Sequence, residues 1–166
     1  MVEQPPSDGY TYQQAVRVDM PQRVPYVTYT ILGITVVIYL AQMLSEILLG
    51  TDLPAYFGMK INEFIIQGQF WRLFTPALLH GSILHIGFNM YALLTIGSGL
   101  ERFFGHGRYL LLYLSGAFAG NVLSFLLSSN PSLGASTAIF GLLGAQGIFL
   151  YRHRELFGSQ ARAALQ

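Results

Sequence analysis

Apolar residues gather in four long runs, separated by shorter segments that carry most of the charges and prolines. The runs lie near residues 26–49, 77–100, 109–127 and 135–151. Crossing the hydrocarbon core of a bilayer takes about 20 mostly apolar residues as a helix. The fourth run is short, about 17 residues or about 25 Å, so we expect one of its ends to begin below the membrane surface. The pattern predicts an all-α membrane protein, built as a polytopic helical bundle.

The composition supports this fold class. Hydrophobic residues make up 52% of the 166 residues and charged residues only 10%, whereas soluble domains contain roughly 25% charged residues. No cysteine is present, so this sequence offers no disulfide, thiolate zinc site or thiol nucleophile. Residues 1–25 are polar, contain prolines and lack the basic and apolar regions of a signal peptide. We expect a polar cytoplasmic tail over 1–25 and a membrane domain over 26–151.

The positions of arginine and lysine predict the orientation. With a cytoplasmic N-terminus and alternating spans, seven arginines fall inside, and only Lys60 and Arg72 fall outside. Cytoplasmic loops carry the excess of these residues, so this orientation is favoured, with external loops over 50–76 and 128–133. The short loops suggest a bacterial inner membrane. The inside arginines are Arg17, Arg23, Arg102, Arg108, Arg152, Arg154 and Arg162.

Polar residues occur in the second and fourth runs on the predicted outer side. His80, His85 and Asn89 lie in the outer part of the second run, and Ser136 lies in the first turn of the fourth. Polar and ionisable groups in membrane segments are costly and usually mark functional sites. His85 and Asn89 are four residues apart and share a helix face. These residue types suit acyl transfer, with a hydroxyl nucleophile and with imidazole and amide donors for an oxyanion.

Ser136 has a setting that favours attack on a carbonyl. It follows Gly134, and the first N–H groups of a helix have no internal partner and favour an anion. Other roles remain open, because a membrane serine often bonds to a carbonyl of its own helix or packs between helices. His85 and Asn89 are equally consistent with an interhelical hydrogen-bonded pair. His80 has a structural role or positions water.

The residues around these positions resemble the rhomboid family of intramembrane serine proteases. The resemblance rests on FWRLFTPALLHGSILHIGFNMYAL, GLERFFG and GASTAIFGLLGA, in the family's order, and extends from about residue 26 to 162. It implies a rhomboid-like bundle with four of the family's six core helices present. It also implies an endopeptidase that cleaves transmembrane substrates near the outer membrane face. The implied partners are transmembrane-helix proteins and membrane lipid, with no cofactor, metal or nucleic acid.

The resemblance assigns roles to individual residues. Gly134, Ala135 and Ser136 match the family's Gly-x-Ser motif, which makes Ser136 the nucleophile. His85 and Asn89 match its oxyanion-stabilising residues.

Supporting residues match the family as well. Trp71 and Arg72 match a structural pair in the first loop, and Glu101 and Arg102 match the pair that ends the second helix. His80 is a supporting residue near the same site.

Two departures from the family pattern affect the expected activity. Thr137 stands where many relatives have glycine, and its methyl group is expected to crowd the substrate channel. The family's general-base histidine comes from its sixth core helix, whereas this sequence stops at Gln166. His106 and His153 are predicted to be surface residues on the cytoplasmic side. We therefore expect 152–166 to be a cytoplasmic tail or truncated linker, and the chain to be an inactive fragment, because loss of the base costs on the order of 10⁴ in rate.

Two other functions remain open. A rhomboid-like pseudoprotease would bind membrane helices without cutting them; the missing base favours it, whereas the intact serine, histidine and asparagine set disfavours it. His80 and His85 as metal or haem ligands are disfavoured, because five residues of helix place them about 140° apart. The sequence does not determine the substrate, the organism or the oligomeric state.

Overall fold

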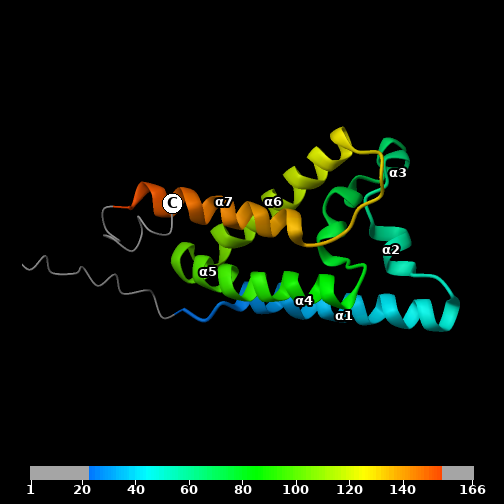
Figure 1. Cartoon of the computed structure of the whole chain (residues 1–166), viewed down its shortest axis with the longest axis horizontal. Helices are drawn as coiled ribbons and strands as arrows, with labels where there is room; N and C mark the ends of the chain where they lie inside the picture. The colour runs from blue at the N-terminus through cyan, green and yellow to red at the C-terminus, as the bar shows by residue number, and fades with distance from the viewer. Residues whose placement is uncertain (1–22, 155–166) are drawn as a thin grey trace, which may run out of the picture.

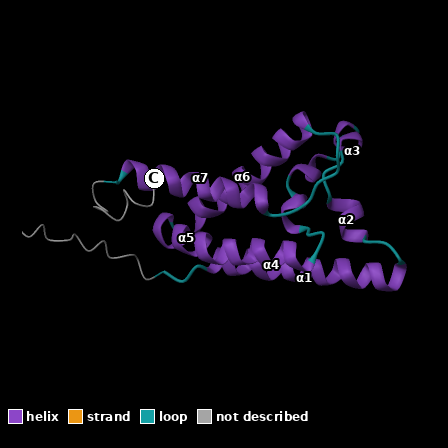
Figure 2. Cartoon of the chain, viewed as in Figure 1, coloured by secondary structure: helices purple, strands orange, loops and turns teal. Residues whose placement is uncertain are grey.

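The computed structural model describes residues 23–154, and these residues form an all-helical bundle (Figure 2). Within this range the only β pairing is an isolated antiparallel bridge between Lys60 and Ser132. The predicted all-α class is therefore confirmed. Residues 1–22 of the expected N-terminal tail and residues 155–166 of the expected linker lie outside the described range. The long elements are α1 (Tyr26–Leu49), α4 (Ile83–Ala92), α5 (Ser98–Phe104), α6 (His106–Leu127) and α7 (Ser136–Arg152) (Figure 1).

Three helices in the described range are long and apolar enough to cross a membrane. They are Tyr26–Leu49, Ile83–Phe104 and His106–Leu127. The second contains α4 and α5, joined without a break by a π-helical segment, Leu93–Gly97. With 17 residues, α7 is shorter, and Figure 1 shows that it begins nearer the middle of the molecule than the ends of α1 and α6. The protein is a multi-pass membrane protein.

The second helix begins at Ile83, later than the apolar run that starts at Ala77 suggests. Pro76 lies in a 3₁₀ turn, Thr75–Leu78, which precedes a short irregular loop. Ser82 then caps α4, because its hydroxyl accepts a hydrogen bond of 3.2 Å from the backbone N–H of His85. Ser, Thr, Asp and Asn are the preferred N-cap residues. His80 therefore lies in the loop before the helix.

The segment between α1 and α4 folds as a compact loop, the 50–82 loop. It contains two short helices, α2 (Leu53–Gly58) and α3 (Asn62–Ile66), and two 3₁₀ turns, Phe70–Leu73 and Thr75–Leu78. Asp52 caps α2 by accepting a hydrogen bond of 2.9 Å from the backbone N–H of Ala55.

Small residues bring α6 and α7 into backbone contact. A Cβ at Gly141 would lie 2.9 Å from the Cα of Gly116, which is closer than any real side chain allows. One turn along α6, a Cβ at Gly120 would lie 2.5 Å from the Cβ of Thr137. The side chain of Thr137 therefore packs against α6, and the expectation that its methyl group crowds a substrate channel is wrong.

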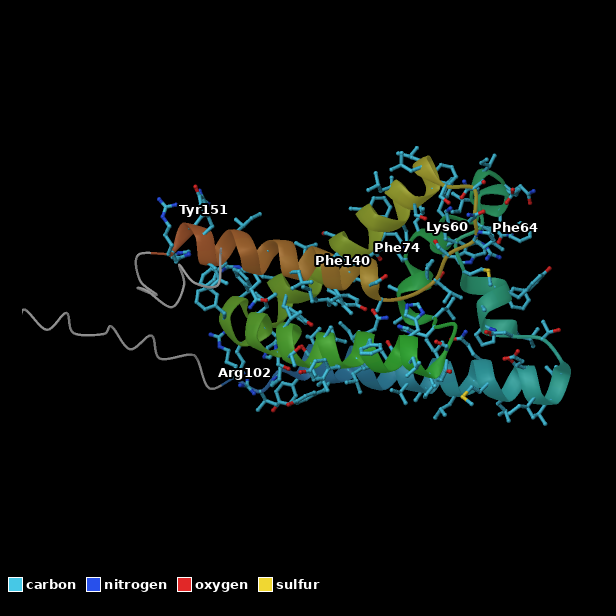
Figure 3. All side chains as sticks on the ribbon, in the orientation of Figure 1. Lys60, Phe64, Phe74, Arg102, Phe140 and Tyr151 are labelled. Carbon is cyan, nitrogen blue, oxygen red and sulfur yellow. The ribbon has the colours of Figure 1, made fainter. Side chains whose placement is uncertain are left out.

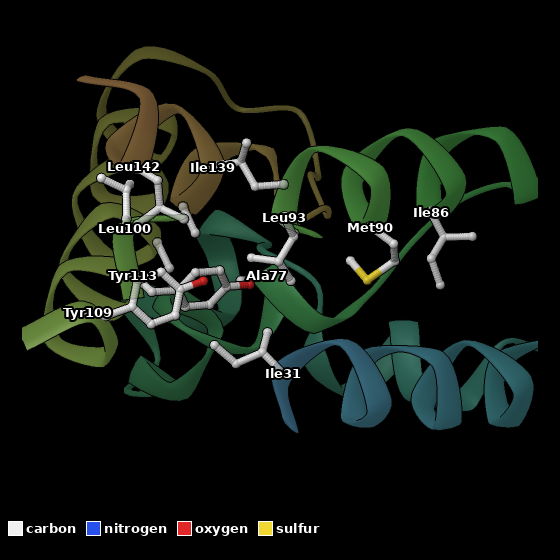
Figure 4. Close-up of a cluster of buried hydrophobic side chains, with 13 residues drawn as sticks. Ile31, Ala77, Ile86, Met90, Leu93, Leu100, Tyr109, Tyr113, Ile139 and Leu142 are labelled. Carbon is white, nitrogen blue, oxygen red and sulfur yellow. The ribbon is translucent and has the colours of Figure 1, made fainter. Parts of the chain in front are cut away.

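A single apolar core joins α1 and the helices from α4 to α7 (Figure 4). Because close packing of this kind excludes voids, it fixes the relative positions of the helices that carry polar residues. The core includes Ile31, Met90, Leu93, Leu100, Tyr109, Tyr113, Ile139 and Leu142.

A buried carboxylate ties the start of α1 to α5 and α6. Pro25, the N-cap residue of α1, provides no capping side chain. The carboxylate of Glu101 instead accepts hydrogen bonds of 2.8 Å from the N–H groups of Val27 and Thr28, and one of 2.6 Å from the Thr28 hydroxyl. Nδ1 of His106 lies 2.6 Å from the same carboxylate. Glu101 thus caps a helix more than 70 residues away in the sequence.

The two ends of the bundle differ in character (Figure 3). Arg102 and Tyr151 lie at one end, near the start of α1 and the end of α7, whereas Lys60 and Phe64 lie at the other. His106 begins α6 and His153 follows α7, so both histidines are at the arginine-rich end.

Candidate active site

Ser136 begins α7 after an extended segment that the 50–82 loop holds in place. The N–H of Gly134 donates a hydrogen bond of 2.8 Å to the carbonyl of Pro76. Ala135 is the N-cap residue, and an alanine has no oxygen with which to cap the first turn. The N–H groups there remain available to a ligand. Ser136 itself is partly exposed.

The imidazole ring of His85 lies directly against Gly134. A Cβ at Gly134 would lie 2.7 Å from both Cε1 and Nε2 of His85, and 3.8 Å from Oγ of Ser136. The backbone φ at Gly134 is +128°, in a region that L side chains rarely adopt. Only glycine satisfies both conditions. The fold thus brings His85 and Ser136 to the same small volume, although 51 residues separate them in the sequence.

Asn89 lies one turn deeper on α4 than His85 and is 7% exposed. Its Nδ2 donates a hydrogen bond of 2.8 Å to the backbone carbonyl of His85. A carboxamide nitrogen carries two N–H groups, so one remains for another acceptor. The amide is therefore oriented by its own helix and keeps a free donor.

His80 contacts His85 and the residue before Ser136. The two rings have centroids 5.0 Å apart and planes at 70°. His80 is 1% exposed, and its Nε2 lies 3.5 Å from the N–H of Ala135. Burial, with a smaller effect of the His85 imidazole, lowers the pKa of His80 to about 4. His80 is therefore neutral at physiological pH, and a neutral Nε2 accepts the Ala135 N–H.

The backbone of His80 is held by Gln42 from α1. Oε1 of Gln42 accepts a hydrogen bond of 3.1 Å from the N–H of His80, and its Nε2 donates to the His80 carbonyl at 3.3 Å. The same Nε2 donates to Asp52 at 2.7 Å. Gln42 is a buried amide in the apolar run of the first helix. A polar residue within an apolar run was the feature of the sequence that could have identified it as a functional position.

Trp71 and Arg72 connect two parts of the 50–82 loop. The Arg72 guanidinium donates hydrogen bonds to the carbonyls of Met59 at 2.7 Å and Tyr56 at 3.0 Å. The Trp71 indole donates to the carbonyl of Phe57 at 3.1 Å. Both residues close the loop around α2.

Lys60 connects the 50–82 loop to the segment that leads to Ser136. It is fully buried, and its Nζ donates hydrogen bonds to the carbonyls of Ser128 at 2.6 Å and Asn130 at 3.1 Å. Its backbone exchanges two hydrogen bonds with Ser132. Lys60 is the only lysine in the chain, and the sequence pattern indicated only that it lies outside. Its contacts hold the α6–α7 connection in place.

No cluster of three or more His, Cys, Asp or Glu side chains in residues 23–154 has the arrangement of a metal site. The two histidines at this end have no acidic side chain as a third ligand in that range.

The sequence was compared with known families and proteins. The rhomboid domain family matches residues 67–165, more than half of the chain. Rhomboid protease GluP of Bacillus subtilis is 39% identical over 80% of this chain. RHOMBOID-like protein 9 of Arabidopsis thaliana is 37% identical over 65%, and Rhomboid-like protease 1 of Toxoplasma gondii is 35% identical over 70%. The matched segments cover 26%, 25% and 43% of those proteins. By this match, and by the helices and site described above, the chain belongs to the rhomboid family of proteases.

Proposed function

We propose that this chain supplies the nucleophile and the oxyanion donors of an intramembrane serine endopeptidase. The observation that carries the proposal is the contact of the His85 ring with Gly134, which leaves imidazole and Ser136 Oγ bordering one small volume. Oγ of Ser136 would attack the carbon of a peptide carbonyl that binds there. The carbonyl oxygen would then carry the developing negative charge.

Three donors are proposed for this charge: the N–H of Ser136, a ring N–H of His85 and the free amide N–H of Asn89. The uncapped first turn of α7 supports the first, because backbone N–H groups at a helix N-terminus favour an anion. Donors of this kind, fixed before the reaction, are each worth about 10²–10³ in rate. His80 would position the site by holding the N–H of Ala135.

The proton of Ser136 requires a base. His80 is buried and its Nε2 already accepts from Ala135, whereas His106 and His153 are at the other end of helices about 25–33 Å long. The rhomboid resemblance assigns the base to a later core helix. We propose that the full-length protein supplies it there.

The proposed substrates are transmembrane helices cut near the outer membrane face. Ser136 begins α7, and the other end of this helix, at Tyr151, lies at the same end of the bundle as Arg102. The excess of arginine at that end favours a cytoplasmic location for it. A cytoplasmic N-terminus and a bacterial inner membrane follow as parts of this proposal.

A fluorophosphonate probe applied to the full-length protein in liposomes tests the proposal. Labelling should occur in the wild type and in Ser98→Ala, a control in the second span, and should be lost in Ser136→Ala. Labelling that persists in Ser136→Ala would contradict the assignment. Absent labelling in the wild type, with retained capture of transmembrane helices, would instead favour the pseudoprotease.

A further inference from the structure

A second site lies at the arginine-rich end of the bundle, away from Ser136. A pocket of about 410 Å³ opens between the end of α5, the first turns of α6 and the last turns of α7. Two arginines and a histidine line it together with five apolar residues. The lining residues are Phe104, Arg108, Leu112, Ala145, Ile148, Phe149, Arg152 and His153.

Neither pocket arginine has a carboxylate partner in residues 23–154. The only ion pair there joins His106 to Glu101, whose oxygens are already occupied by the start of α1. Arg108 lies in the first turn of α6, where the helix dipole disfavours a cation. Helix stability therefore does not explain Arg108. Arg152, in the last turn of α7, does suit the dipole, but it faces the same pocket.

The charged and apolar residues of the pocket are separated along the axes of α6 and α7. Leu112 lies one turn inward from Arg108 on α6, and Ile148 lies one turn inward from Arg152 on α7. Each step of four residues is about 6 Å along the helix. The arginines therefore line the part of the pocket nearest the helix ends. The apolar wall continues from there toward the middle of the helices.

We propose that this pocket binds an anionic phospholipid of the cytoplasmic leaflet. The phosphodiester would lie between the guanidinium groups of Arg108 and Arg152, which suit planar, bidentate binding of phosphate. One acyl chain would lie along Leu112 and Ile148. Charge and shape both favour this occupant: a free phosphate has nothing to place against the apolar wall, and a zwitterionic lipid brings its own cation toward the arginines. Basic pockets between helices at the cytoplasmic side are known to suit such head groups.

The test uses the full-length protein in detergent with dioleoyl phosphatidylglycerol, dioleoyl phosphatidylcholine or inorganic phosphate, followed by native mass spectrometry and thermal melting. Phosphatidylglycerol should bind and raise the Tm, and the other two should not. The double variant Arg108→Gln/Arg152→Gln should bind it at least about tenfold more weakly. Arg154→Gln is the matched control, because the Arg154 guanidinium stacks on the Tyr151 ring at 4.8 Å and does not line the pocket.

A further variant separates the lipid from a simple anion. Ile148→Gln should weaken phosphatidylglycerol binding while both arginines remain. The proposal would be overturned by equal stabilisation with inorganic phosphate, or by unchanged lipid binding in the double variant. A third result would also overturn it: the lipid has no effect, and the double variant has a lower Tm than the wild type without lipid. Residues 155–166 would then be the better occupant of the pocket.

Discussion

Gly134 and His85 occupy complementary positions: the imidazole ring fills the space where any other residue at position 134 would place its Cβ. That Cβ would lie 2.7 Å from two ring atoms, and the same ring contacts the ring of His80, with centroids 5.0 Å apart. The glycine of the Gly-x-Ser sequence is thus required by a contact with another helix as well as by its own backbone conformation.

Gly134→Ala tests this contact. The positive φ and the clash with His85 should together cost about 1–3 kcal/mol locally, which corresponds to a loss of about tenfold or more in the labelling rate of Ser136. Fluorophosphonate labelling of the full-length protein measures it. Gly144→Ala, at a helical position where nothing lies within 4 Å of an added Cβ, is the control. Equal labelling of both variants would contradict the close contact.

Lys60→Met should destabilise the protein. The substitution removes the hydrogen bonds that Nζ donates to the carbonyls of Ser128 and Asn130, and the Ser128 carbonyl keeps only the bond of 3.2 Å from Nδ2 of Asn62. Loss of hydrogen bonds from a charged group costs about 1–3 kcal/mol. Burial also lowers the pKa of Lys60, against the opposing effect of Glu63. Thermal melting in detergent measures the loss. The control is Gln67→Met, at an exposed position in the same loop, which should have the Tm of the wild type. An unchanged Tm for Lys60→Met would contradict a stabilising role of its hydrogen bonds.

Glu101→Gln should weaken the attachment of α1. One carboxylate oxygen becomes an NH₂ group that faces the donors of Val27 and Thr28, so at least one hydrogen bond is lost. A loss of about 2–4 kcal/mol is expected. Hydrogen exchange at the start of α1 should increase together with a lower Tm. Glu46→Gln, exposed near the other end of α1, is the control, and equal effects of the two variants would contradict the capping role.

Stability should fall on mild acidification because of His80. Its pKa is about 4 in the fold, below the ordinary value of about 6.5. Between these values the unfolded chain binds more protons than the folded one, so the free energy of unfolding decreases as the pH falls from about 6.5 to 4. Melting of the wild type and His80→Gln across this range measures the effect. The variant should show a shallower decline, and parallel curves would contradict the assignment to His80.

Gly120 and Thr137 should be energetically coupled. Gly120→Ala places a methyl group 2.5 Å from the Cβ of Thr137, and overpacking of this kind costs about 1–3 kcal/mol. Thr137→Gly removes the clashing atom, so the double variant should recover most of the lost Tm. A double-mutant cycle measures this coupling. Additive effects of the two substitutions would mean that the helices separate instead.

The helices could be predicted from apolar runs, but their starts depended on local chemistry. The first run coincides with α1, since it contains no proline and no charge before Glu46. The second run, 77–100, follows Pro76, which lies in a 3₁₀ turn, and it contains Ser82, which caps the helix that begins at Ile83. The position of Thr137 was misjudged because its packing against Gly120 depends on how α6 meets α7, and that crossing is not visible in a local pattern.

The candidate site could be predicted from the sequence only in part. The spacing of His85 and Asn89, with Ser136 at a helix start, was readable because each rests on helix geometry. The residues that hold these groups in place were not predicted, since Gln42 acts on His80 across 38 residues and Lys60 acts on Asn130 across 70. Their partners are backbone carbonyls and N–H groups, which leave no signature in residue identity. Polar residues isolated in apolar surroundings were the only hint.

The capping of α1 by Glu101 has a consequence for how the protein is made. The first helix leaves the ribosome more than 70 residues before its cap, so its leading turn enters the bilayer with two N–H groups unsatisfied. They gain their acceptor only when the second membrane segment, Ile83–Phe104, which contains Glu101, has inserted beside them. The capping of the first membrane segment is thus completed by the second, and a nascent chain arrested before Glu101 should hold its first helix loosely in the membrane.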